Sequence, residues 1–355
     1  MSSHLEADLG GGRRASLQEF GHEGEVVLLL PGAGADRMAL GLQGRALQAA
    51  GYRALSLDYP GLGLAEGPLP REVPDLARYA FAALDALGVQ RCHLLGQSLG
   101  SAVAQEMALL EPARAASLML LATWGRQDGF LELRSRIVAL IARQPVADRL
   151  AMLPYFMASR TLITSLGQSG GASLGLRGSQ AVSDETMSRY LELARDTDRL
   201  ERLAELRLPC LVLAGERDLM TPWEYGREVA DAIPGARFHL LEGPRSSHLF
   251  HYELGEETNR EILNFLYRVA TSWKGAGRLA SLSELPEKER RFALKLAYWS
   301  WFSLLLGALG IILWLRKVLP TGLLPIAFVF VLLFVAQEIW QSFYTRQVLR
   351  RTEHK

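Results

Sequence analysis

The chain has 355 residues, with 39 Lys and Arg against 38 Asp and Glu, so its formal net charge is +1. This balance excludes a strong overall attraction to polyanions, and nothing else in the sequence predicts nucleic-acid binding. The length allows one large domain with additions. The two cysteines, Cys92 and Cys210, fall in apolar runs and indicate core residues rather than a disulfide framework. No metal-ligand spacing is present, and no motif predicts a cofactor.

Strand and helix patterns alternate through the first half of the chain. Residues 1–25 are polar and glycine-rich, which predicts no signal peptide, and we expect 1–20 to be a flexible N-terminus. The alternation that follows is typical of a mostly parallel sheet with helices on both faces. The predicted strands are Val26–Leu30, Ala54–Tyr59, Arg91–Leu95 and Ser117–Ala122, and the predicted helices are Met38–Ala50, Pro74–Leu87 and Ser101–Leu110.

The most informative motif lies between the third of these strands and the helix after it. Residues 96–100 read Gly-Gln-Ser-Leu-Gly, a G-x-S-x-G pattern in a strand–turn–helix context. Such a turn holds its serine in a strained conformation, and glycines at Gly96 and Gly100 leave room for the neighbouring strand and helix. Ser98 is therefore the candidate nucleophile.

The alternation stops at residues 125–208 and resumes after them. Helical patterns cover Phe130–Arg143, Val146–Ser159 and Asp184–Leu206, with a glycine- and serine-rich loop around 167–173. Strands are then predicted at Pro209–Ala214 and Ala236–Leu241, and helices at Glu224–Ala232 and Glu257–Ala270. The core built around this sheet would thus end near residue 272, giving a domain over 21–272.

Each of the last two strands runs into a loop with an ionisable side chain. Asp218 follows the first strand and His248 the second. A serine hydroxyl needs a base to take its proton, and the base needs a carboxylate to fix its tautomer. Asp218 and His248 suit these roles, while Glu216 remains an alternative acid and His251 and His239 remain alternative bases.

The order Ser, Asp, His, each just past a strand end, resembles the α/β-hydrolase superfamily. Two upstream segments strengthen the resemblance: Pro31-Gly32-Ala33-Gly34 is similar to its oxyanion loop, and Asp58-Tyr59-Pro60-Gly61-Leu62-Gly63 to its D-x-P-G-x-G turn. The resemblance implies the α/β-hydrolase fold and an oxyanion hole from the N–H groups of Leu99 and Ala33, with Gly34 as the alternative to Ala33. The loop departs from the family's usual His-Gly start. Asp58 is expected to be structural.

The resemblance also implies that 125–208 is a helical cap that covers the pocket. Met152, Tyr155 and Phe156 are candidate substrate-binding residues, because an apolar cluster there could hold an acyl chain. Ordinary packing of the cap against the core is the alternative.

The C-terminal region departs from this pattern. Residues 273–286 are predicted to be a linker, and 287–355 a charged flank with a two-helix transmembrane hairpin. The two apolar segments, about 297–315 and 323–340, approach the ~20 residues that a spanning helix needs. Positive charges flank the hairpin on both sides and favour a cytoplasmic placement of both termini and of the catalytic domain.

These features predict a membrane-anchored serine hydrolase that cleaves a carboxylic ester, with a small-molecule or lipid-like substrate and the lipid bilayer as its partners. Three alternatives stay open: an acyltransferase, a hydrolase of C–C bonds with the same triad, and a non-catalytic binding protein of this fold.

Overall fold

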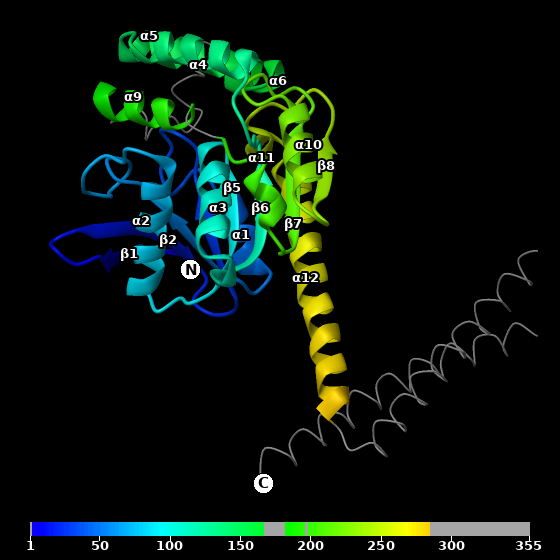
Figure 1. Ribbon diagram of the computed structural model, residues 1–355. Helices are drawn as coiled ribbons and strands as arrows, with labels where there is room; N and C mark the ends of the chain where they lie inside the picture. Colours follow the sequence, from blue (N-terminus) through cyan, green and yellow to red (C-terminus); the bar gives the residue numbers. More distant parts are fainter. Residues whose placement is uncertain (1, 167–181, 196–197, 285–355) are drawn as a thin grey trace, which may run out of the picture. The chain divides into compact units, whose positions relative to one another are not determined.

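The computed structural model describes residues 2–166, 182–195 and 198–284. The chain divides into two compact units, Met1–Val269 and Ala270–Lys355. The first unit contains the sheet, the cap and the candidate site (Figure 1). Of the second unit, only the helical residues 270–284 are described.

The centre of the first unit is one eight-stranded sheet in the order β1-β2-β4-β3-β5-β6-β7-β8. β1 pairs with β2, and β2 with β4, in antiparallel fashion, and every later pair is parallel. All six predicted strands are found, and no strand end is shifted by more than two residues. The strands are β1 (Ser2–Asp8), β2 (Arg14–Phe20), β3 (Val26–Leu30), β4 (Arg53–Leu57), β5 (Cys92–Gln97), β6 (Ala115–Leu121), β7 (Cys210–Gly215) and β8 (Arg237–Leu241).

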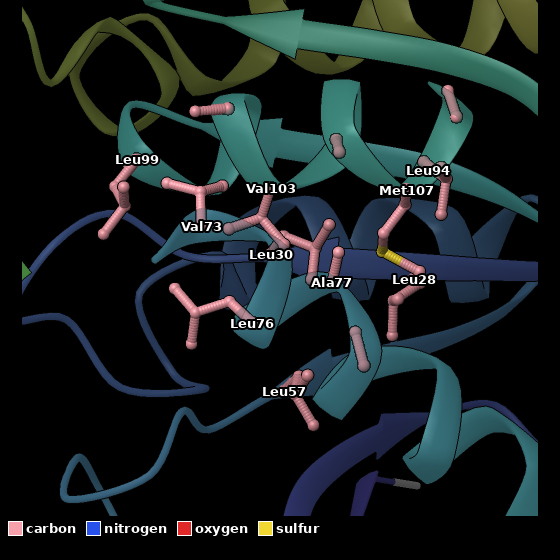
Figure 2. Packing of buried hydrophobic residues seen from close by; sticks show 14 of the residues in the cluster. Leu28, Leu30, Leu57, Val73, Leu76, Ala77, Leu94, Leu99, Val103 and Met107 are labelled. Carbon is pink, nitrogen blue, oxygen red and sulfur yellow. The ribbon is translucent and has the colours of Figure 1, made fainter. Parts of the chain in front are cut away.

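Helices cover both faces of the sheet, as the alternating pattern predicts. One face carries α2 (Val73–Ala86), α3 (Leu99–Leu110) and α10 (Trp223–Ala232). The other carries α1 (Gly41–Ala49), α11 (Phe250–Glu253) and the first part of α12 (Gly255–Glu284). Figure 2 shows Val103 and Met107 of α3 and Ala77 of α2 among the leucines of the central strands. Burial of this apolar surface stabilises the layers and fixes the strand ends that carry the site.

The insertion between β6 and β7 is helical, as predicted, and lies beyond one end of the sheet (Figure 1). Its described helices are α4 (Gly129–Ala142), α5 (Val146–Met157), α6 (Arg160–Leu166) and α9 (Asp184–Leu193), followed by the 3₁₀ turn η3 (Arg202–Glu205). The predicted loop at 167–173 lies outside the described residues.

One predicted cap helix, Asp184–Leu206, is too long, because α9 ends at Leu193. Beyond it the chain returns to the core. Arg199 Nε lies 2.7 Å from Glu106 Oε2 on α3, and the Arg199 N–H donates to the Gly125 carbonyl at 2.7 Å. These bonds give the side chain and the N–H group of Arg199 partners outside the cap, although the sequence pattern predicts this residue to be part of a longer helix.

The expectation of a flexible N-terminus at 1–20 is wrong, because β1 and β2 form an antiparallel hairpin in the sheet. Gly10, Gly11 and Gly12, which suggested flexibility, have φ angles of 75°, 62° and 76°. Glycine adopts such angles without the penalty of a Cβ, so the three residues form the tight turn of the hairpin.

The predicted linker at 273–286 also needs correction, because α12 continues to Glu284. Glycine inside a helix costs only about 1 kcal/mol relative to alanine, so Gly275 and Gly277 do not end it. The predicted spans, 297–315 and 323–340, lie outside the described residues. Within the described part of the chain, no helix is both long and apolar enough to cross a membrane.

Candidate active site

Ser98 lies at the turn between β5 and α3, with φ 53° and ψ −123°. A non-glycine residue with positive φ is strained and must be held by its surroundings. Both backbone groups are held: Ser98 N–H donates to the Leu121 carbonyl at 2.9 Å, and its carbonyl accepts from Ser101 N–H at 2.8 Å. The Ser101 hydroxyl donates to the same carbonyl at 2.6 Å.

The two glycines of the motif are required by close backbone approach. A Cβ at Gly96 would lie 2.1 Å from the Gly100 carbonyl oxygen, and one at Gly100 would lie 1.9 Å from the Leu30 carbonyl oxygen. Both distances are far inside van der Waals contact. The strand, the turn and the helix can therefore pack only with glycine at these positions.

Asp218 and His248 meet beyond the ends of β7 and β8. His248 Nδ1 lies 2.8 Å from Asp218 Oδ2 and 3.0 Å from Oδ1, and the imidazole is only 2% exposed. The carboxylate also accepts from the N–H groups of Met220 and Thr221, at 2.8 and 2.9 Å, and from the Thr221 hydroxyl at 2.8 Å. This network holds the carboxylate toward Nδ1, which leaves Nε2 as the ring nitrogen free to act as a base.

Gln97, which sequence analysis left without a role, faces that nitrogen. Its Nε2 lies 3.4 Å from His248 Nε2. Among the described residues, the side chains of Ser98 and His248 are not hydrogen-bonded to each other. Catalytic hydrogen bonds are often long in a ligand-free site and form when substrate binds. Gln97 therefore occupies space beside the nitrogen that would take the serine proton.

Ala33 and Leu99, the predicted pair of backbone donors, lie on two segments next to Ser98. Leu99 is the first residue of α3, so its N–H has no acceptor within the helix. Ala33 follows Gly32, where a Cβ would lie 3.2 Å from Ser98 Cβ and 2.6 Å from Gln97 Oε1. The loop after β3 thus approaches the serine closely enough to contribute a donor. Gly34, the alternative, lies against the cap, because a Cβ there would meet Met187 Cε at 2.6 Å.

Within the described residues, the alternative acid, Glu216, and the alternative bases, His239 and His251, are not part of a carboxylate–histidine pair like that of Asp218 and His248. Glu216 is exposed and accepts from Gly243 N–H at 3.0 Å, and His239 lies within β8. His251 is buried, and burial lowers its pKa to about 3. Its Nδ1 has no hydrogen-bond partner among the described residues. His251 thus lacks the carboxylate that orients a catalytic histidine.

Asp58 has the structural surroundings expected from sequence. It is fully buried and accepts from Ser16 Oγ at 2.9 Å, from Leu64 N–H at 2.9 Å, and from both Arg37 N–H and Nη1, at 2.7 and 2.6 Å. The two bonds from Arg37 join the segment between β3 and α1 to the turn after β4.

Neither thiol competes with Ser98 as a nucleophile. Burial raises the pKa of Cys92 to about 12 and raises that of Cys210 as well, so both stay protonated at neutral pH. Among the described residues, no three His, Cys, Asp or Glu side chains gather as metal ligands.

Residues 25–252 match the family described as the alpha/beta hydrolase fold. The chain belongs to this family. It is 30% identical over 252 residues to the Variovorax paradoxus protein named "Putative carbamate hydrolase RutD", covering 70% of this chain and 94% of that protein. It is 28% identical to 2-hydroxy-6-oxo-6-phenylhexa-2,4-dienoate hydrolase of Burkholderia cepacia, covering 71% and 91%. A solved hydrolase structure from Pseudomonas aeruginosa has 26% identity and a TM-score of 0.65, covering 75% of this chain and 98% of that one.

Two of the three predicted substrate-binding residues are exposed on the cap. Met152 and Tyr155, on α5, are 45% and 70% exposed, and Phe156 is half-buried with its ring 5.3 Å from that of Tyr155. Helical periodicity marks an apolar face but not which face meets the core. Met187 of α9, buried against the oxyanion loop, is the cap residue that sequence analysis missed.

A half-buried arginine of the cap lies beside the loop that carries Asp218. Arg134 on α4 donates to the Met220 carbonyl at 3.1 Å, and its guanidinium carbon is 5.6 Å from the centre of the Trp124 ring. Burial lowers the pKa of Arg134 to about 10, and the nearby Asp218 carboxylate opposes this shift. The guanidinium therefore stays charged at neutral pH and places a positive charge near Asp218.

Proposed function

We propose that this hydrolase cleaves carboxylic esters with Ser98 as nucleophile, His248 as base and Asp218 as the carboxylate that orients the base. The observation that carries the proposal is the pairing of buried Asp218 and His248 at 2.8 Å, next to a serine held at φ 53° at the start of a helix. A structural turn serine would need neither the strained backbone nor a histidine paired with a carboxylate.

In the proposed reaction, His248 Nε2 takes the proton of the Ser98 hydroxyl as Oγ attacks the ester carbonyl. The carbonyl oxygen becomes an oxyanion, which the N–H groups of Ala33 and Leu99 stabilise. The tetrahedral intermediate expels the alcohol, which receives the proton from His248. Water then attacks the acyl-enzyme with His248 again as base, releases the acid and restores Ser98.

The test is covalent labelling together with turnover. Wild-type protein should react with a fluorophosphonate probe at Ser98 and hydrolyse a small activated ester. Ser98→Ala should lose labelling and about 10⁴-fold or more of kcat, because the covalent route is gone. Ser165→Ala, at an exposed serine of α6, is the matched control and should behave as wild type. Labelling that persists in Ser98→Ala would contradict the proposal.

C–C bond hydrolysis is the second candidate, because a relative is named as a hydrolase of a 2-hydroxy-6-oxo-dienoate. The same triad could serve this reaction. Comparing kcat/KM on an activated ester and on a dienoate of that class decides between the two substrate classes.

We also propose that apolar segments 297–315 and 323–340 anchor the chain in a membrane, with the catalytic domain and both termini on the cytoplasmic side. Their length and flanking positive residues support this proposal, as does their low charge: 297–315 has no charged residue, and 323–340 has only Glu338, near its end. A lipid-like ester would then be available from the bilayer. Alkaline carbonate extraction tests the anchor, since a peripheral protein would be released.

A further inference from the structure

Glu253, at the end of α11, is a buried carboxylate without a charged partner. It is 9% exposed, and no Lys, Arg or His of the described residues pairs with it. Its hydrogen-bond donors are all neutral. Burying a carboxylate in this way costs free energy that an apolar residue would not. The position of those donors therefore needs an explanation.

The donors come from two separate parts of the molecule. Ser159, between cap helices α5 and α6, donates its N–H to Glu253 Oε1 at 2.9 Å and its hydroxyl to Oε2. Ser247, in the loop after β8, donates its hydroxyl to Oε1 at 2.5 Å. One carboxylate thus joins the cap to the residue directly before His248.

The residue directly after His248 is joined to the cap as well. Leu249 donates its N–H to the carbonyl of Met157, the last residue of α5, at 3.2 Å. The Leu249 N–H also lies 3.1 Å from the Ser247 hydroxyl. Both neighbours of His248 are therefore bonded to the same end of α5, one directly and one through Glu253.

This arrangement bears on catalysis because Asp218 alone does not fix His248. The 2.8 Å bond to Asp218 sets the tautomer and the tilt of the ring, while the distance from Nε2 to Ser98 depends on the loop backbone. Displacement of a reacting group by about 1 Å can cost about 100-fold in rate. A bond that holds the loop would therefore act on kcat.

We propose that Glu253 is a positioning residue that couples the cap to the catalytic histidine. It holds Ser247 against the Ser159 end of the cap, so the cap takes part in placing the base. Loss of the cap-side contact should then slow acylation of Ser98 even for an ester too small to touch the cap. This inference rests on the proposed triad.

The sharpest test is Ser159→Ala, compared with Ser183→Ala. Each serine accepts an N–H from the residue three positions on, Leu162 or Thr186, both at 3.1 Å, so each substitution removes a similar helix cap. Of these two serines, Ser159 bonds to Glu253, whereas Ser183 bonds to Thr186. On a small soluble ester, we expect Ser159→Ala to lower kcat and the fluorophosphonate labelling rate roughly tenfold. This is less than the ~100-fold cost of a full 1 Å displacement, because the loop keeps its other bonds. KM should change less than twofold, and Ser183→Ala should change neither parameter by more than twofold.

A second variant and a double variant distinguish loss of the proposed coupling from misfolding of Ser159→Ala. Glu253→Gln keeps the size of the side chain but loses carboxylate acceptors, and it should also lower kcat with little change in KM. Ser159→Ala added to Glu253→Gln should cost less than twofold more, because both changes remove the same link. Additive losses would overturn the coupling.

Hydrogen exchange separates this proposal from the proposed function. In Ser159→Ala, peptides covering 243–253 should exchange faster than in wild type, whether or not the protein turns over an ester. Wild type that is not labelled at Ser98 would overturn the proposed function. Labelled wild type with unchanged kcat and exchange in both variants would overturn the positioning role alone.

Discussion

We expect acid to destabilise this protein because it would protonate His251, a buried histidine that forms no ion pair with any of the described residues. The side chain is 5% exposed, beside the ring of Phe250, and its Nδ1 has no hydrogen-bond partner among the described residues. Burial, with a smaller contribution from the nearby His248, lowers the pKa to about 3, although Asp218 opposes the shift. Protonation would therefore place a cation in a site that does not solvate it.

The size of the effect follows from the difference in pKa between the folded and the unfolded chain. The ordinary value is 6.5, so between pH 6.5 and about 3 the unfolded state binds a proton that the folded state does not. The free energy of unfolding therefore falls as the pH falls through this window. For this single group the loss is about 2 kcal/mol at pH 5, and it vanishes above pH 7.

Urea unfolding, followed by tryptophan fluorescence at pH 7.5 and pH 5.0, measures this loss. In His251→Gln, which cannot take a proton in this range, the drop between the two pH values should be about 2 kcal/mol smaller than in wild type. His239→Gln removes a half-buried histidine of β8 and is the control. An equal drop in wild type and His251→Gln would refute the reasoning.

Two further predictions concern the turn and the C-terminal region. Gly100→Ala should prevent accumulation of folded protein, because its Cβ would lie 1.9 Å from the Leu30 carbonyl oxygen. The control is Gly129→Ala, which should be tolerated because nothing in the described part of the chain lies within 4 Å of its added Cβ. Equal yields of soluble, cooperatively unfolding protein from the two variants would contradict this prediction. A chain ending at residue 272 should keep its kcat/KM on a soluble ester but lose about tenfold or more on a long-chain ester in liposomes, since the proposed anchor raises the local substrate concentration. Equal losses on the two substrates would contradict delivery from the membrane.

The turn at Ser98 was predictable because close packing around it restricts the residue type at two positions of its motif. A Cβ at Gly96 or Gly100 would lie 2.1 or 1.9 Å from a backbone oxygen, so only glycine fits, and the sequence motif shows this requirement. Asp218 and His248 were predictable for a related reason: each follows a short apolar strand, and parallel strands bring their carboxyl ends to one edge of the sheet. Their pairing at 2.8 Å agrees with that reasoning, while their catalytic role stays a prediction.

The N-terminal hairpin was not predictable from composition, because glycine favours tight turns and flexible chains alike. Gly10, Gly11 and Gly12 form a turn only because β2 pairs with β4, a contact between segments about 40 residues apart that leaves no local signal. The same limit explains the outward exposure of Tyr155: periodicity defines a stripe on α5, while the packing partner decides which stripe is buried.

The supports of the site include a part of the molecule outside the sheet that carries its candidate catalytic groups. Ser98, Asp218 and His248 are positioned by strand ends of one sheet, whereas Glu253 accepts from Ser159, a cap residue 94 positions earlier in the chain. A motif can identify a side chain that reacts, because the chemistry restricts the residue type. It cannot identify a side chain that holds the reacting group, since any hydrogen-bonding residue at the right place would serve. Substitutions in the cap should therefore be judged by their effect on the His248 loop as well as by their contact with substrate.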